Sequence, residues 1–220
     1  MSLNRKLLAF YRRIKSGQVM TAFYLAYYYS YLYLYDLSKK TNFANSQTAE
    51  EGGVPDGGTG NFPAHPVLVR KYLRAASLDR NEKILDVGHG SGIVLDVASR
   101  MGFNDLTGIE YSEIAYKLSQ QNIGRRAKLI HGNAIDLDLS PYSVIFFFSP
   151  FRGELAKKFF EKISASSVRV ILTVNHDPEI EPILLPHYKL VYTYQHFLYR
   201  NFNCKIWVRE LIQGPPSFEK

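Results

Sequence analysis

Short apolar runs alternate with helix-like segments along the chain from residue 83 onward. The short runs are rich in Val, Ile, Leu and Phe, whereas the longer segments repeat their apolar residues every three or four positions. This alternation predicts an α/β fold in which crossover helices join parallel strands. The predicted strands are 83–87, 106–110, 127–131, 143–148 and 168–174, and the predicted helices are 91–101, 112–122 and 153–164.

Two connections depart from this regular alternation. The gap from His131 to Tyr142 leaves little room for a crossover helix, so we expect a loop or a single turn there. At the end of the chain, two strand-like runs, 188–199 and 202–211, are separated only by Arg200-Asn201. These runs predict an antiparallel hairpin at one edge of the sheet.

The first 62 residues follow a different pattern. Residues 3–15 and 18–38 predict helices, although alternating tyrosines leave a strand open at 27–35. Residues 41–62 predict a loop, with five glycines between residues 50 and 60, and a loop of this length is either disordered or functional, such as a lid. A helix is predicted at 63–76. We therefore divide the chain into an N-terminal helical extension with a glycine-rich loop, 1–62, and an α/β domain, 63–220.

Charge is concentrated in the same N-terminal segment. The net charge is +7, and residues 1–40 hold seven basic groups and one acidic group. This segment could contact a membrane surface or a partner, although a solvated helix face explains the charge more simply. The uncharged stretch 16–35 contains seven tyrosines and so is a poor candidate for a membrane span. The nearly neutral remainder gives no reason to expect a nucleic-acid substrate.

The cysteine content indicates the cellular compartment in which the protein folds. Cys204 is the single cysteine, so no disulfide can form within the chain. Together with the absence of an export signal near the first residue, this predicts a cytoplasmic protein.

A glycine-rich loop joins the first predicted strand to the following helix. Residues 86–92 read Asp-Val-Gly-His-Gly-Ser-Gly, a spacing that allows a sharp turn and close approach to a ligand. A dinucleotide fingerprint would place its third glycine at Ile93 rather than at Gly92. Asp86 precedes the first glycine by two residues, and a carboxylate there favours a cationic ligand over a pyrophosphate. S-adenosylmethionine is such a ligand; a turn that binds nothing is the alternative.

These residues resemble the first motif of the class I S-adenosylmethionine-dependent methyltransferases, and the resemblance extends over about residues 63–211. It implies that Asp86, Gly88, His89, Gly90 and Gly92 hold the methionine part of the cofactor. It also implies a Rossmann-like three-layer sandwich with a seven-stranded, mostly parallel sheet in the order 3-2-1-4-5-7-6. In such enzymes, segments before the first motif often cover the site, which makes residues 18–62 a candidate substrate cap.

The resemblance assigns the rest of the cofactor site to the ends of two further strands. Glu110 would accept hydrogen bonds from the two ribose hydroxyls, and Tyr111 would lie against the adenine. Asn133 stands where the family usually has an aspartate that accepts from the adenine amino group, and Ala134 follows it. An amide oxygen can accept the same bond, although asparagine is also a common turn residue.

At the end of the fourth strand, Ser149-Pro150-Phe151 resembles the Asn/Asp/Ser-Pro-(Pro)-aromatic motif of some amino-group methyltransferases. It is also similar to an Asn-Pro-Phe motif in small bacterial methyltransferase-like proteins. The resemblance implies that Ser149 contacts cofactor and acceptor nitrogen, and that Phe151 packs on the acceptor. The alternative is a strand terminator with Phe151 in the core. No general base can be assigned from the sequence.

The remaining candidates give weaker signals. The six histidines have no metal-ligand spacing, so we expect no metal site. Residues 175–177, Asn-His-Asp, could reach the substrate or form a turn. The tyrosine cluster at 24–35 could bind a cationic amine or simply pack.

We therefore expect a methyltransferase that uses S-adenosylmethionine and acts on a small molecule or a protein, with an amine as the working choice of acceptor. A NAD-type oxidoreductase and a non-catalytic cofactor-binding module that acts through its N-terminal helices are the alternatives.

Overall fold

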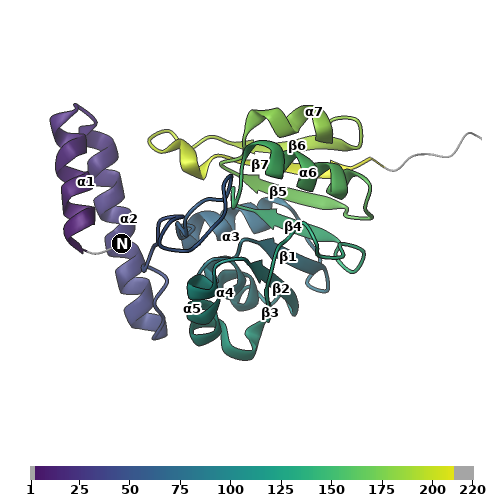
Figure 1. The fold of residues 1–220 in the computed structure, drawn as a ribbon, viewed down its shortest axis with the longest axis horizontal. Coiled ribbons are helices and arrows are strands. Elements are labelled where there is room, and N and C mark those ends of the chain that lie inside the picture. Colours follow the sequence, from purple (N-terminus) through teal and green to yellow (C-terminus); the bar gives the residue numbers. More distant parts are fainter. Residues whose placement is uncertain (1–2, 211–220) are drawn as a thin grey trace, which may run out of the picture.

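Seven strands form one sheet in the order β3-β2-β1-β4-β5-β7-β6, the predicted order (Figure 1). The computed structural model describes residues 3–210, with side chains from residue 7. Strands β1 to β5 are parallel to one another, and β7 runs antiparallel to both β5 and β6. The strands are β1 Lys83–Val87, β2 Asp105–Glu110, β3 Lys128–His131, β4 Val144–Phe147, β5 Val170–Val174, β6 Tyr188–Tyr194 and β7 Cys204–Arg209.

Helices cover both faces of this sheet, which gives the predicted three layers. The helices are α1 Leu3–Lys15, α2 Val19–Lys39, α3 Pro66–Ala75, α4 Ile93–Arg100, α5 Glu113–Ile123, α6 Gly153–Ser164 and α7 Glu181–Leu184. Short 3-10 turns lie at Gly124–Arg126, Pro178–Ile180 and Arg200–Phe202.

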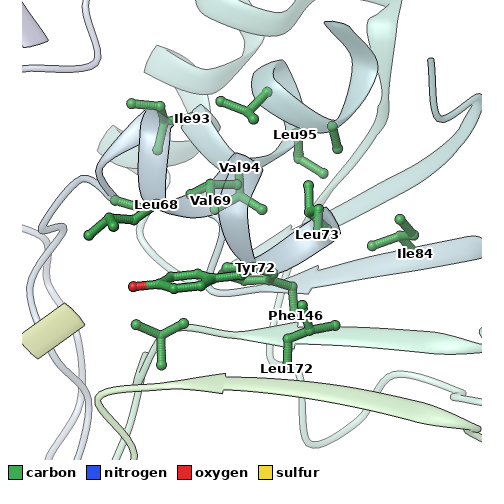
Figure 2. Packing of buried hydrophobic residues seen from close by; sticks show 14 of the residues in the cluster. Leu68, Val69, Tyr72, Leu73, Ile84, Ile93, Val94, Leu95, Phe146 and Leu172 are labelled. Atoms are coloured by element: carbon green, nitrogen blue, oxygen red, sulfur yellow. The ribbon is translucent and has the colours of Figure 1, made fainter. Parts of the chain in front are cut away.

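The continuous apolar sequence of β4 reflects burial on both sides. Val144 and Phe146 belong to the core beneath α3 and α4, where Leu68 and Val94 also pack (Figure 2). Ile145 and Phe147 belong to the opposite core, which includes Phe159 and Phe160 of α6. Successive side chains of a strand point to opposite faces, so a central strand between two helical layers needs apolar residues at every position.

Helices α1 and α2 lie side by side at one end of the molecule (Figure 1). The rings of Phe10 and Phe23 meet edge to face between them, 5.8 Å apart. Residues 27–35 are helical, so the strand alternative for them is wrong. Within the described part of the chain, no helix combines the length and apolar character needed to cross a membrane.

Two predicted helices begin later than expected because the residue before each first turn, His65 or Gly92, has a non-helical backbone conformation. His65 caps α3 by accepting from the backbone N–H of Val67, and Pro66 occupies the first helical position. Gly92, with φ of 92°, caps α4. The segment between β3 and β4 contains no helix, as expected.

The predicted hairpin turn at Arg200-Asn201 is wrong. Strand β6 ends at Tyr194 and β7 begins at Cys204, so nine residues separate them. This segment folds inward because Phe202 is buried and its carbonyl accepts a hydrogen bond from the Tyr72 hydroxyl on α3. The predicted end of the second run, Leu211, lies outside the described residues.

Candidate functional site

The glycine loop turns sharply between β1 and α4. Gly88, Gly90 and Gly92 all have positive φ, which favours residues without a Cβ. At Gly88 there is a second reason, because a Cβ there would overlap the ring of Pro150. The loop and the segment after β4 are therefore in direct contact.

Two buried acidic side chains flank this loop. The Oε2 of Glu110 accepts a hydrogen bond from the N–H of Gly90, and its Oε1 accepts one from Ser112, each at 2.8 Å. Burial raises the pKa of Asp86 well above its usual range, and the Glu110 carboxylate raises it further. Burial also raises the pKa of Glu110, although the backbone N–H groups oppose that effect. A positive charge beside this pair would favour the ionised carboxylates.

His89 has a structural position within the loop. Its Nδ1 lies 2.9 Å from the Gly90 carbonyl oxygen, and its ring packs where a Cβ at Gly108 would lie. Burial lowers the pKa of His89 to about 4, so the ring is neutral at pH 7.

A cavity of about 230 Å³ lies beside the glycine loop, and we call it the loop cavity. Four buried polar atoms on its wall have no hydrogen-bond partner: Asp86 Oδ2, His89 Nε2, Ser91 Oγ and Gln47 Oε1. Because buried polar atoms in proteins are almost always paired, this group indicates that a polar ligand completes the site.

The structure brings most of the predicted cofactor residues to this cavity. Those that line it are Asp86, Gly88, His89, Gly90, Glu110, Tyr111, Asn133 and Ala134. Pro150 and Phe151, which belong to the predicted reaction motif, also line it. Gly92 does not line it and instead packs against Ile123. The Oδ1 of Asn133 accepts from the N–H of Ile135, so this residue also forms the turn that the sequence allowed.

The glycine-rich linker, which is part of the candidate cap 18–62, forms a wall of the loop cavity. Thr59 donates from its N–H to the Pro150 carbonyl and from its hydroxyl to the Ser149 carbonyl, both at 2.8 Å. Asn61 lies against Gly90, where a Cβ would overlap its side chain. The Thr59 contacts join residues about 90 positions apart in the sequence, so no local sequence pattern predicts them.

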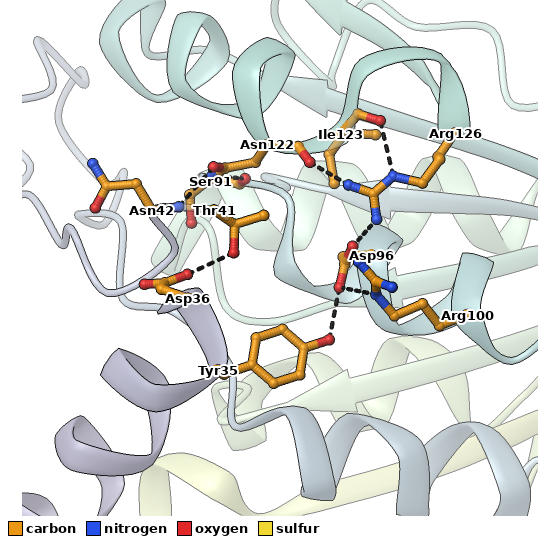
Figure 3. Close-up of polar contacts among 10 residues, drawn as sticks. All are labelled: Tyr35, Asp36, Thr41, Asn42, Ser91, Asp96, Arg100, Asn122, Ile123 and Arg126. Carbon is orange, nitrogen blue, oxygen red and sulfur yellow. Dashed lines mark hydrogen bonds and ion pairs between the residues drawn. The ribbon is translucent and has the colours of Figure 1, made fainter. Parts of the chain in front are cut away.

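Polar contacts tie α2 and the linker to the glycine loop (Figure 3). The Asn122 side chain accepts from the N–H of Asn42 and donates to the Ser91 carbonyl. The Tyr35 hydroxyl donates to the buried Asp96 at 2.7 Å, and Arg100 and Arg126 pair with the same carboxylate. The N-terminal segment is thus connected to both helices that flank the loop.

The predicted reaction motif separates into two environments. Phe151 packs against Phe147 and Phe159, with ring centroids 5.2 and 5.4 Å apart, so its ring is largely in the core as the alternative reading held. Ser149 is buried with φ of 41°, and its Oγ accepts from Arg152 Nε at 3.3 Å. It does not line the loop cavity.

Ser149 lines a second cavity of about 760 Å³, which we call the helix cavity because α1 and α2 form one side of it. Asn175, from the 175–177 segment, also lines it. His176 does not line this cavity, and its Nε2 lies 3.0 Å from Glu181 Oε1. Asp177 caps the following 3-10 turn. Residues 7–210 contain no cluster of potential metal ligands.

Comparison with known proteins bears on both the loop and the sheet. The family model described as ribosomal protein L11 methyltransferase (PrmA) matches residues 57–136, which include the end of the linker, the glycine loop, Glu110 and Asn133. Among solved structures, the ribosomal protein L11 methylase from Lactobacillus delbrueckii subsp. bulgaricus aligns with a TM-score of 0.56 at 17% identity. The alignment covers 68% of this chain and 81% of the methylase chain.

The fold is that of the class I S-adenosylmethionine-dependent methyltransferases. Magnesium protoporphyrin IX methyltransferase from Synechocystis PCC 6803, solved with bound S-adenosylmethionine, has the same fold, with a TM-score of 0.54 at 16% identity over 66% of this chain and 77% of its own.

Curated relatives match over shorter segments of this chain. EEF1A lysine methyltransferase 2 from Danio rerio is 38% identical over 60 residues, 27% of this chain and 25% of that protein. Ribosomal protein L11 methyltransferase from Desulforamulus reducens is 29% identical over 93 residues, 40% of this chain and 30% of that protein. The chain therefore spans less than a third of the length of either relative.

Proposed function

We propose that the protein is a methyltransferase that takes its methyl group from S-adenosylmethionine. The observation that carries this proposal is the unpartnered Asp86 carboxyl oxygen, buried at the end of β1 on the wall of the loop cavity. An ammonium group would supply the missing partner and stabilise the ionised carboxylate. A pyrophosphate would bring two more negative charges beside Asp86 and Glu110, which argues against a NAD-type cofactor.

The cavity residues fit the parts of this cofactor. Asp86 would hold the ammonium group, and Glu110, with lone pairs left on both oxygens, would accept from the ribose hydroxyls. Tyr111 and Asn133 would contact the adenine. When bound, the cofactor supplies an electrophilic methyl group on a sulfonium, and the protein's main task is then to align an acceptor with it.

The acceptor side of the site is built by other parts of the chain. The matched segment 57–136 supplies most of the loop-cavity wall, whereas α1, α2 and the segments after β4 and β5 lie outside the matched segment. We propose that the first 62 residues act as the acceptor-side cap. The names of the curated relatives point to protein acceptors, and a small molecule is the other class to be tested.

Calorimetric titration with S-adenosylhomocysteine, with NADH in parallel, tests the proposal. We expect micromolar binding of S-adenosylhomocysteine and none of NADH. Asp86→Asn and Glu110→Gln should each weaken binding at least about tenfold, because each removes a charge-assisted contact. Tyr33→Phe, on the exposed side of α2, should bind normally. NADH binding in place of S-adenosylhomocysteine would refute the methyltransferase assignment.

We also propose that α1 and α2 contact an anionic membrane surface. Leu8, Tyr11 and Met20 are each at least half exposed, and the exposed Arg12 and Lys15 lie on the same hairpin. Apolar and basic side chains together favour the interface of an anionic bilayer. Sedimentation with phosphatidylglycerol vesicles should fall for Leu8→Glu and Met20→Glu but not for Leu185→Glu, an equally exposed leucine elsewhere. Equal sedimentation of all three variants would exclude this contact.

A further inference from the structure

The helix cavity is large enough for a drug-sized molecule, at about 760 Å³. Apolar and aromatic side chains form much of its wall, from Phe10 on α1 and Leu25 and Tyr29 on α2 to Phe62 and Tyr199 on the body of the protein. Binding sites for small molecules typically combine such a wall with a few polar groups.

The helix cavity adjoins the loop cavity. The two share six wall residues, Gln47, Thr59, Gly60, Asn61, Phe62 and Phe148. Pro150, next to Ser149, faces the loop cavity, whereas Ser149 faces the helix cavity. An acceptor in the helix cavity would therefore lie beside a cofactor in the loop cavity, at the end of β4.

Backbone strain marks the same place. Ser149 and Asn175 have φ of 41° and 52°, and they follow the adjacent strands β4 and β5. Both line the helix cavity. Non-glycine residues in this conformation cost free energy and concentrate at functional sites.

The charges on the wall select the acceptor. Arg13 and Arg152 line the helix cavity, and no acidic residue lines it among the described residues. Neither arginine has a carboxylate partner in the part of the chain from residue 7 to 210. Arg152 donates to Ser149 and Arg13 to the Ala9 carbonyl, but neither guanidinium charge is neutralised. Two such groups repel a protonated amine and attract a carboxylate, which one guanidinium can bind through two hydrogen bonds.

The wall also lacks a base. No histidine, aspartate, glutamate, lysine or cysteine is among the described residues that line the helix cavity. Burial raises the pKa of both Tyr29 and Tyr199, so their hydroxyls stay protonated. An amine or alcohol would need to lose a proton here, whereas a carboxylic acid is already ionised at neutral pH.

We propose that the helix cavity binds the methyl acceptor and that the acceptor is a carboxylic acid on a largely apolar skeleton, with Arg152 and Arg13 as its anionic anchors. This proposal rests on the proposed methyltransferase activity. A carboxylate oxygen forms a bond to the sulfonium methyl carbon, the carbon–sulfur bond breaks, and its electron pair stays on sulfur. The products are a methyl ester and neutral S-adenosylhomocysteine, and no proton is released.

Matched acids and amines test this proposal by calorimetry on protein saturated with S-adenosylhomocysteine. The pairs are octanoate with octylamine, and 5-phenylpentanoate with 5-phenylpentylamine. We expect each acid to bind at least about tenfold more tightly than its amine. Arg152→Gln and Arg13→Gln should reduce this preference, whereas Lys158→Gln, at an exposed residue of α6 that does not line the cavity, should leave it unchanged.

Either equal or tighter binding of the amines, or no binding of the acids, overturns the carboxylate proposal while S-adenosylhomocysteine still binds. Loss of S-adenosylhomocysteine binding itself would instead refute the proposed function. A second readout uses methyl-labelled S-adenosylmethionine with the acids that bind. A methyl ester releases its label as volatile methanol in alkali, so a product label that is stable in alkali also overturns the proposal.

Discussion

At the scale of single residues, burial of the Asp86 and Glu110 carboxyl groups lowers the stability of the ligand-free protein, and the proposed cofactor binding uses the same two groups. Both are buried, and the pKa of each is raised, chiefly by burial. The folded state of Asp86 therefore holds its proton more strongly than the unfolded chain does. The free energy of unfolding should fall as pH rises from the unfolded pKa, near 4, through the raised folded pKa.

Asp86→Asn should accordingly stabilise the ligand-free protein while it weakens S-adenosylhomocysteine binding, because asparagine keeps the shape and removes the charge. The gain in Tm over the wild type should grow with pH above about 4. Thermal melts across the pH range measure this. Asp138→Asn is the control, since hydrogen bonds from Ser140 lower the pKa of that exposed carboxyl and no gain is expected. A constant difference in Tm at all pH values would contradict this account.

Gly88→Ala should destabilise the protein more than Gly102→Ala. Both glycines have positive φ, and alanine there costs about 1–2 kcal/mol. Only at Gly88 would the new Cβ also overlap Pro150, which should add about 1–3 kcal/mol; at Gly102 nothing lies within 4 Å. Urea denaturation of the two variants measures the difference. Equal losses would mean that the loop can move away from Pro150.

At the scale of elements, the contact between α2 and α4 is the testable link. Tyr35→Phe removes a hydrogen bond to the buried Asp96, so we expect a loss of about 1 kcal/mol in the free energy of unfolding. Tyr33→Phe is the matched control on the same helix, because Tyr33 is exposed. Chemical denaturation compares them, and an equal effect of both substitutions would show that the Tyr35 bond contributes little.

The elements also show what a sequence can and cannot predict. Local patterns were sufficient for most strands and for the glycine loop, because strand periodicity and glycine spacing are short-range properties. The place of Glu110 in the cofactor site was expected from the family resemblance instead. They failed for residues 195–203, whose path depends on Phe202 reaching Tyr72, 130 positions away. They also left Phe151 undecided, since a strand-end aromatic can face either core or ligand.

At the scale of the whole molecule, the two cavities are built by different stretches of chain. The loop cavity is formed mainly by β1, β2 and the turn after β3, whereas α1, α2 and the segment after β5 contribute only to the helix cavity. The linker and the segment after β4 contribute to both. Arg13, one of the proposed anchors, comes from the basic first segment. The positive charge that the sequence places there thus has an inward-facing part as well as an exposed one.

This division has an evolutionary consequence. Substitutions along α1 and α2 can reshape the helix cavity without touching Asp86, Glu110 or the glycines that turn the loop. Such substitutions can therefore change the acceptor that is bound while the binding of S-adenosylmethionine stays the same. The six shared wall residues do not offer this independence, because a substitution at any of them alters the walls of both cavities at once.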